Sequence, residues 1–265
     1  MKKAVIAVIA IPLVLTGLWL VSVPEAWIIR QMEDAMGRQG MKVRIMGFSK
    51  GLLYNFSIRQ MHVSTEKDSP IVSVNDLHAW VDFFSLLKFK PQFDFSGSVN
   101  GGRVYGVIRL RGLGKGGMTI NVNGNGININ GIPAIERFGG RANGNLGFDL
   151  HLMDNTGEVK FSIREARFEG VFPGVDFLPL FLFQSVRGTL RIEKTITVKY
   201  LTLEGKGVYA RVNGNIRGNS PSTKIELMMD SSFGLEPVLA KSLEPYKMSP
   251  GYYVIPSSHI FPNPP

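Results

Sequence analysis

Residues 98–111 read SVNGGRVYGVIRLR and combine the two local signals that recur along this chain. The first is an Asn-Gly pair at Asn100, a dipeptide that is typical of tight hairpin turns because both residues tolerate positive φ. The second is strict alternation after the pair: Val104, Gly106, Ile108 and Leu110 alternate with Arg103, Tyr105, Arg109 and Arg111. Alternation with a period of two predicts a half-buried β-strand, with one apolar and one polar face.

The same alternation continues along the chain. It predicts further strands over about 41–48, 52–64, 71–83, 92–99, 117–130, 143–152, 159–164, 187–193, 195–204, 208–217 and 222–230. Asn-Gly pairs begin at residues 100, 123, 125, 130, 143 and 213, and they favour a meander of antiparallel hairpins. Some of these pairs could instead lie within strands as bulges. After residue 40, short helical patterns are confined to about 132–138 and 177–183, so the predicted fold class is mainly β.

Composition removes several classes of protein. The chain has 265 residues, of which 44% are hydrophobic and 19% charged, so the bulk of it is not disordered. The 30 glycines have no period of three, which excludes collagen. Cysteine is absent, which excludes disulfides, thiolate metal sites and cysteine nucleophiles. Cysteine usage therefore does not indicate whether the protein lies in an oxidising or a reducing compartment.

The N-terminus predicts a membrane anchor. Lys2 and Lys3 precede an uncharged apolar run from Ala4 to Val23, which is long enough to cross a bilayer. A cleaved signal peptide is the alternative, but its apolar core is shorter and Val21-Ser22-Val23-Pro24 is a poor cleavage site. We expect residues 1–24 to form a cytoplasmic tail and single-pass anchor, and 25–40 an amphipathic stalk helix. Residues 41–248 would form a β-domain on the side of the membrane opposite the cytoplasm. Residues 249–265 would form a final edge strand or a loose tail.

No motif of catalysis or cofactor binding stands out. Gly112 to Gly117 satisfies G-x-G-x-x-G, but a strand follows it where the dinucleotide motif requires a helix. The four histidines lie outside metal-ligand spacing and are interpreted as solvated strand residues: His62, His78, His151 and His259. We therefore expect no enzyme activity, no metal and no cofactor.

The formal net charge of +9 is spread along the chain. Arg103, Arg109 and Arg111 could share one sheet face, as could Arg211 and Arg217, but no aromatic residues interleave with them as in nucleic-acid sites. Attraction of these arginines to anionic lipid headgroups is the alternative to a solvated basic face, and the solvated face is favoured. The apolar segment 171–183 is interpreted as a plug over the open side of a curved sheet, or as a patch for a partner or an acyl chain.

Three groups of phrases along the chain are characteristic when taken together. They are Gly40-Met41-Lys42-Val43 leading into Gly51-Leu52-Leu53-Tyr54; Leu77 to Asp82, Ser85-Leu86-Leu87-Lys88 and Asn100 to Gly106; and Phe177-Leu178-Pro179 followed by Gly188-Thr189-Leu190. With the predicted anchor and helix, these phrases resemble the family of type II secretion system N proteins, which is itself similar to the AsmA-type family of membrane-anchored periplasmic proteins. The last phrase of the chain, Tyr252 to Pro265, is only a loose match.

The resemblance implies a long, twisted, partly open antiparallel sheet with an apolar groove. It implies a non-enzymatic, single-pass component of the bacterial inner membrane, with its C-terminal domain in the periplasm. That component would belong to the apparatus that exports folded proteins across the outer membrane. The expected partners are the inner membrane, other secretion subunits and, as an alternative function, the acyl chains of lipids; no nucleic acid is expected.

Overall fold

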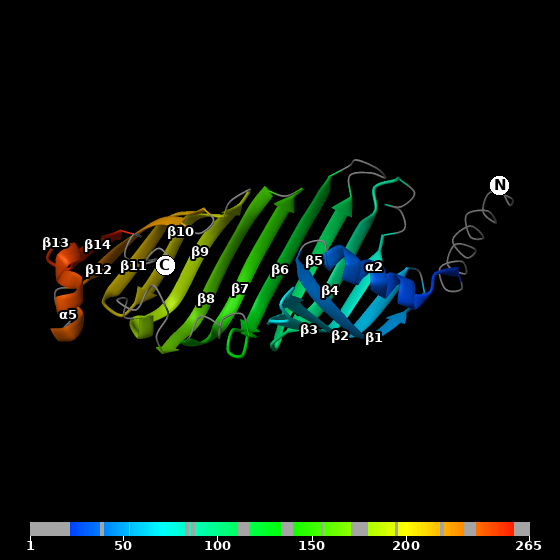
Figure 1. Cartoon of the computed structure of the whole chain (residues 1–265), viewed down its shortest axis with the longest axis horizontal. Helices are drawn as coiled ribbons and strands as arrows, with labels where there is room; N and C mark the ends of the chain where they lie inside the picture. The colour runs from blue at the N-terminus through cyan, green and yellow to red at the C-terminus, as the bar shows by residue number, and fades with distance from the viewer. Residues whose placement is uncertain are drawn as a thin grey trace, which may run out of the picture. The chain divides into compact units, whose positions relative to one another are not determined.

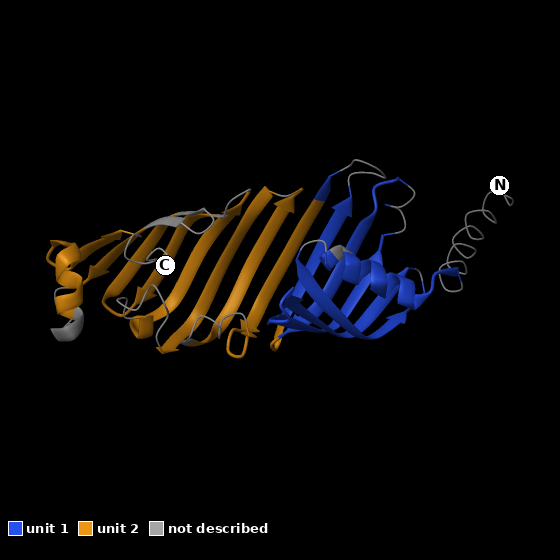
Figure 2. Cartoon of the chain, in the orientation of Figure 1, with its two compact units in different colours: residues 1–99, 103–118 blue, residues 100–102, 119–265 orange. Residues whose placement is uncertain are grey.

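The structure is a computed structural model (Figure 1), and it describes residues 22–37, 40–52, 54–82, 85, 88–110, 117–133, 140–154, 156–170, 180–193, 196–217, 220–230 and 237–256. The chain divides into two compact units (Figure 2). Unit 1 comprises residues 1–99 and 103–118, and unit 2 comprises residues 100–102 and 119–265.

The fold is mainly β, as the alternation predicts. Within the described residues the sheet has 14 strands, which follow one another in chain order from β1 to β12 and end in the order β14-β13. The elements carried largely by unit 1 are α2 (Glu25–Gly37), β1 (Met41–Lys50), β2 (Asn55–Thr65), β3 (Pro70–Val81), β4 (Gln92–Val99) and β5 (Gly102–Leu110).

Unit 2 carries the remaining strands and a helical cap. Its elements are β6 (Met118–Asn128), β7 (Gly140–Met153), β8 (Thr156–Gly170), the short 3-10 helix η1 (Leu180–Leu182), β9 (Phe183–Ile192), β10 (Ile196–Gly205), β11 (Val208–Arg217), β12 (Ser220–Met229), α5 (Pro237–Leu243), η2 (Glu244–Tyr246), β13 (Lys247–Ser249) and β14 (Tyr252–Pro256). The prediction of one open antiparallel sheet is confirmed.

The predicted anchor lies outside the described residues, apart from Ser22 and the residues that follow it. Among the helices that the structure does describe, none is long and apolar enough to cross a membrane. The predicted short helix at 132–138 also falls almost entirely outside the described chain, as do residues 177–179 of the second one.

The Asn-Gly pairs, for which the sequence predicts turns or bulges within strands, occur in both settings. Asn100-Gly101 does form a tight turn, with φ of 48° and 82°, and Asn130-Gly131 lies in another. The other four pairs lie within β6, β7 and β11. Register shifts at Gly124/Ile127 in β6 and at Asn143/Asn145 in β7 mark bulges there, as the alternative interpretation predicts. Tolerance of positive φ suits a bulge as well as a turn, so the dipeptide alone does not distinguish them.

In unit 1, α2 packs along the edge strand β1. The helix begins after Pro24, whose carbonyl accepts hydrogen bonds from the N–H groups of Trp27 and Ile28. Lys50, at the end of β1, donates from Nζ to the carbonyl of Val23 over 2.6 Å and from its backbone N–H to Glu25 Oε1 over 3.2 Å. The first turn of α2 is therefore tied to the end of β1.

The core of unit 2 lies beneath its last strands. Phe183, Ala210, Leu227, Leu243 and Ile255 are completely buried there. Leu243 comes from α5, a helix that was not predicted, and it closes the end of this core. The tail from residue 249 was predicted as an edge strand or a loose tail. Its part 252–256 forms β14, which lies between β12 and the three-residue edge strand β13.

Candidate functional site

The sheet of unit 2 has one continuous apolar face. Cross-strand pairing links one residue of each strand from β6 to β14 into a row, and paired residues point to the same side of a sheet. The row runs Gly124, Phe148, Phe161, Gly188, Leu201, Val212, Ile225 and Ile255. We call the side chains of this row and its apolar neighbours the apolar face.

Two neighbouring rows extend the apolar face on either side. One is Val122, Leu150, Val159, Leu190 and Val198, and the other is Ile127, Leu146, Ile163, Val186, Leu203, Ala210 and Leu227. The bulge in β10 keeps Val198 and Leu201 on the same side although they are three residues apart. Toward β12 these side chains are buried, whereas in β6 to β8 most are only half-buried.

Glycines within the strands accommodate the aromatic rings of this face. A Cβ at Gly124 would lie 2.2 Å from the ring of Phe148, and a Cβ at Gly188 would lie 2.6 Å from the ring of Phe161. These distances are far below van der Waals contact, so each ring lies directly over its glycine. The two rings are thereby laid against the sheet, and the apolar face stays smooth across four strands.

The opposite face of unit 2 is polar and crossed by ion pairs. Glu158 on β8 pairs with Lys160 over 3.5 Å and with Lys199 on β10, and Lys224 pairs with Glu226 over 2.9 Å on β12. The hydrogen bond from Lys199, followed by charge attraction, holds the pKa of Glu158 below its ordinary value despite some burial. Much of the basic charge on this face is therefore balanced locally.

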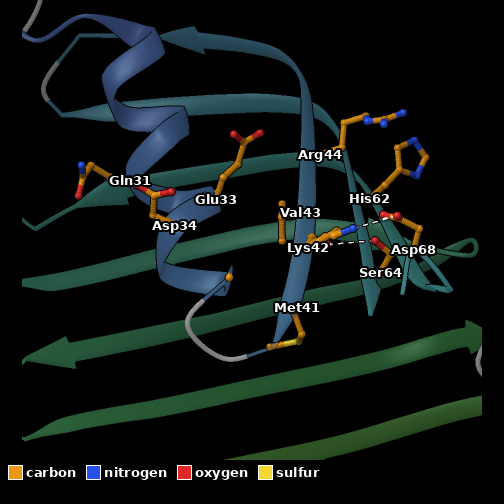
Figure 3. A pocket seen from close by; sticks show the side chains of 11 residues that line it. Gln31, Glu33, Asp34, Met41, Lys42, Val43, Arg44, His62, Ser64 and Asp68 are labelled. Carbon is orange, nitrogen blue, oxygen red and sulfur yellow. Dashed lines mark hydrogen bonds and ion pairs between the residues drawn. The ribbon is translucent and has the colours of Figure 1, made fainter. Parts of the chain in front are cut away.

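A hollow lies in unit 1, between α2 and the edge strand β1 (Figure 3). Its volume is about 1040 Å³, and it is lined on the helix side by Gln31, Glu33 and Asp34. On the sheet side it is lined by residues 41–44 of β1 together with His62, Ser64 and Asp68. Lys42 and Asp68 form an ion pair of 2.8 Å there. The charges are mixed in sign, and within the described residues no group of His, Asp or Glu could hold a metal ion.

The residues singled out from the sequence are dispersed. His62 on β2 bonds through Nδ1 with Ser73 Oγ over 2.7 Å, His151 on β7 bonds with Asn121, and His78 lies exposed on β3. His259, the loop 112–116 and Arg111 lie outside the described residues. Arg103 and Arg109 are both exposed on β5, and Arg109 donates from Nε to Gln92 Oε1 over 2.9 Å.

The apolar segment 171–183 divides into two parts. Residues 171–179 lie outside the described chain. Of the rest, Phe183 is completely buried in the core of unit 2, whereas Phe181 is 67% exposed. Sequence reasoning missed the Gly124 to Gly188 row, although glycines at apolar positions of alternating strands were a usable signal.

Comparison with known proteins gave no match: no family model, no curated protein and no solved structure matches this chain. Function is therefore inferred from the faces of the sheet and from the phrases of the sequence.

Proposed function

We propose that this chain is a non-enzymatic, membrane-anchored envelope protein that binds acyl chains of lipids on its apolar face. The observation that carries the proposal is the continuity of the apolar rows across β6 to β12, with half-buried side chains from Val122 to Leu190. Each CH₂ of an acyl chain that leaves water for such a surface contributes about 0.8 kcal/mol. A row of aliphatic and aromatic side chains without hydrogen-bonding groups suits that ligand.

The test compares two aspartates placed on opposite faces of one strand. Val122 and Asn123 are neighbours on β6, both half-buried, on the apolar and the polar face respectively. The full chain is purified in mild detergent and its bound lipid is quantified by mass spectrometry. Lipid held by the predicted anchor is common to all variants, so the difference between variants reports the apolar face.

We expect lipid to remain with the wild type and with Asn123→Asp, and to fall at least about tenfold with Val122→Asp. A charge on this face opposes an apolar ligand by more than the 1.4 kcal/mol that a tenfold change requires. Circular dichroism shows whether Val122→Asp remains folded, and Val122→Asn serves as a milder variant. Equal lipid in wild type, Val122→Asp and Val122→Asn, all folded, rules out the proposal.

A second candidate is a subunit of the type II secretion apparatus, which the resemblance implies. The feature that favours it is the edge strand β1, which among the described strands pairs with β2 alone and borders the hollow beside α2. Such an edge offers backbone groups for the addition of a partner strand. Deletion of the gene should then block export of folded proteins through the outer membrane, and normal export in the deletion strain would exclude this role.

A further inference from the structure

One end of unit 1 exposes large apolar side chains. The turn between β1 and β2 and the connection between β3 and β4 both lie at this end, because successive antiparallel strands run in opposite directions. Leu52 is 64% exposed there, Phe89 is 67% exposed and Trp80, at the end of β3, is 45% exposed. The opposite end differs, since the turn between β2 and β3 exposes Glu66, Lys67 and Asp68.

Phe89 adopts a backbone conformation that its side chain does not favour. Its φ is +54°, in the left-handed region, where a bulky residue is uncommon and where glycine or asparagine is preferred. The segment around it is held by two hydrogen bonds, from Lys90 N–H to the Ser85 carbonyl over 3.0 Å and from Gln92 N–H to Ser85 Oγ over 2.8 Å. Strained residues that are kept in place in this manner cluster at functional sites.

Two lysines flank the exposed ring. Lys88 and Lys90 are both exposed, and neither has an acidic partner within the described part of the chain. Lysine beside an exposed aromatic ring is the pattern of a membrane interface, where the ring enters the headgroup region and the ammonium group meets phosphate. Each lysine near an anionic surface contributes attraction that salt weakens.

The N-terminal end of the described chain lies at the same end of unit 1. Lys50 Nζ donates to the carbonyl of Val23, so the end of the predicted anchor lies beside the turn that carries Leu52. Trp27, in the first turn of α2, is 56% exposed. A chain that leaves a bilayer at Val23 would bring this end of the sheet, and not the charged end at Lys67, toward the headgroups.

We propose that Leu52, Trp80 and Phe89, with Lys88 and Lys90, form a docking surface for the headgroup region of an anionic bilayer, the membrane that also holds the predicted anchor. Docking at this surface would give unit 1 a defined orientation on the membrane. The proposal rests on the predicted anchor and does not depend on acyl-chain binding by unit 2, so either can fail alone. The lipid difference between Val122→Asp and wild type reports only the latter.

The absence of cysteine permits single-site labelling of the full chain. Leu52→Cys, Phe89→Cys and the control Lys67→Cys are each labelled with a polarity-sensitive fluorophore and placed in nanodiscs with or without phosphatidylglycerol. We expect labels at 52 and 89 to shift to the blue and to be quenched by spin-labelled lipid, most strongly with phosphatidylglycerol, while the label at 67 stays in water. Equal emission and quenching at all three positions would overturn the proposal, as would shielding of 52 and 89 only on addition of another protein.

A second comparison separates docking from a structural role of the ring. Phe89→Asn removes the ring and suits the left-handed conformation, so the midpoint of thermal unfolding should stay or rise while lipid quenching of the label at 52 falls several-fold. Lys88→Gln with Lys90→Gln should remove the dependence on phosphatidylglycerol and on salt. A lowered unfolding midpoint in Phe89→Asn with unchanged quenching would assign the ring to folding and contradict docking.

Discussion

Thr189 on β9 carries a buried hydroxyl on the polar face of the sheet, where it pairs across the strands with Lys160 and Tyr200. It is only 2% exposed, and its Oγ1 has no hydrogen-bond partner among the residues that the structure describes. An unpaired buried hydroxyl costs about 1–3 kcal/mol of desolvation. Thr189→Val should therefore raise the free energy of unfolding by about 1 kcal/mol, measured by urea denaturation.

The control for this substitution is Thr202→Val on β10. Thr202 Oγ1 donates to the carbonyl of Arg187 over 3.4 Å, so its hydroxyl already has a partner. We expect no gain of stability there. A loss of stability in Thr189→Val would show that the buried hydroxyl is satisfied in solution.

Gly188 illustrates how a single missing side chain shapes the apolar face. Alanine at this position would place its Cβ 2.6 Å from the ring of Phe161, and the ring would have to lift from the sheet. Gly188→Ala should cost about 1–3 kcal/mol of unfolding free energy, as overpacking does, and should lower acyl-chain binding because the raised ring roughens the face. Gly37→Ala, where nothing lies within 4 Å of the new Cβ, is the matched control and should cost nothing.

At the scale of an element, the polar side of β8 couples stability to pH. The hydrogen bond from Lys199 lowers the pKa of Glu158 in the folded state relative to the unfolded chain. A carboxyl whose pKa falls on folding contributes stability above its unfolded pKa and loses it as the pH falls through the folded pKa. The stability difference between wild type and Glu158→Gln should be present at neutral pH, at most about 1 kcal/mol for so exposed a pair, and should vanish in acid.

Urea denaturation of both proteins over a pH series below neutrality measures this difference. Lys241→Gln, an exposed change on α5, is a control that should follow the wild type at every pH. A difference that persists unchanged into strong acid would show that Glu158 contributes by packing and not by charge.

The helix α5 acts as a cap on the core of unit 2. Leu243 is completely buried although the helix has only seven residues. Leu243→Ala should cost about 2–5 kcal/mol, as in other buried leucines, and Lys241→Ala on the same helix should cost little. Thermal unfolding compares the two, and equal effects would argue that the cap is not part of the cooperative core.

The strands were predictable because alternation is local, whereas their pairing details were not. The strand predicted over 41–48 spans Met41–Lys50, and the strand predicted over 222–230 spans Ser220–Met229. The bounds of both strands therefore agree within two residues. In β1 the alternation of exposed and half-buried residues is interrupted, since Met46 and Gly47 are both exposed. The φ of Gly47 is +67°, and the local sequence did not predict this interruption. The row from Gly124 to Gly188 spans four strands, so it emerges only from their register.

At the scale of the whole chain, the apolar N-terminal run and the docking surface proposed for unit 1 belong to one hypothesis of membrane attachment. The full chain should stay with the membrane fraction after extraction at alkaline pH, because a run of twenty apolar residues is long enough to cross the bilayer. A variant that lacks residues 4–21 should be released by high salt, since only screened surface attraction would remain. Release of the full chain at alkaline pH would contradict the anchor.

The order of strands has a consequence for how the chain assembles. From β1 to β12 each strand lies beside its predecessor in sequence, so every new pairing closes only a short loop. Such a sheet can grow one strand at a time during synthesis, because each new strand pairs with the strand that precedes it in the sequence. The last step is different, because β14 pairs with β12, whereas β13, which precedes β14 in the chain, pairs with β14 at the outer edge. We therefore expect protection of backbone amides to advance from the N-terminal strands and to be completed when the β13–β14 hairpin adds to β12.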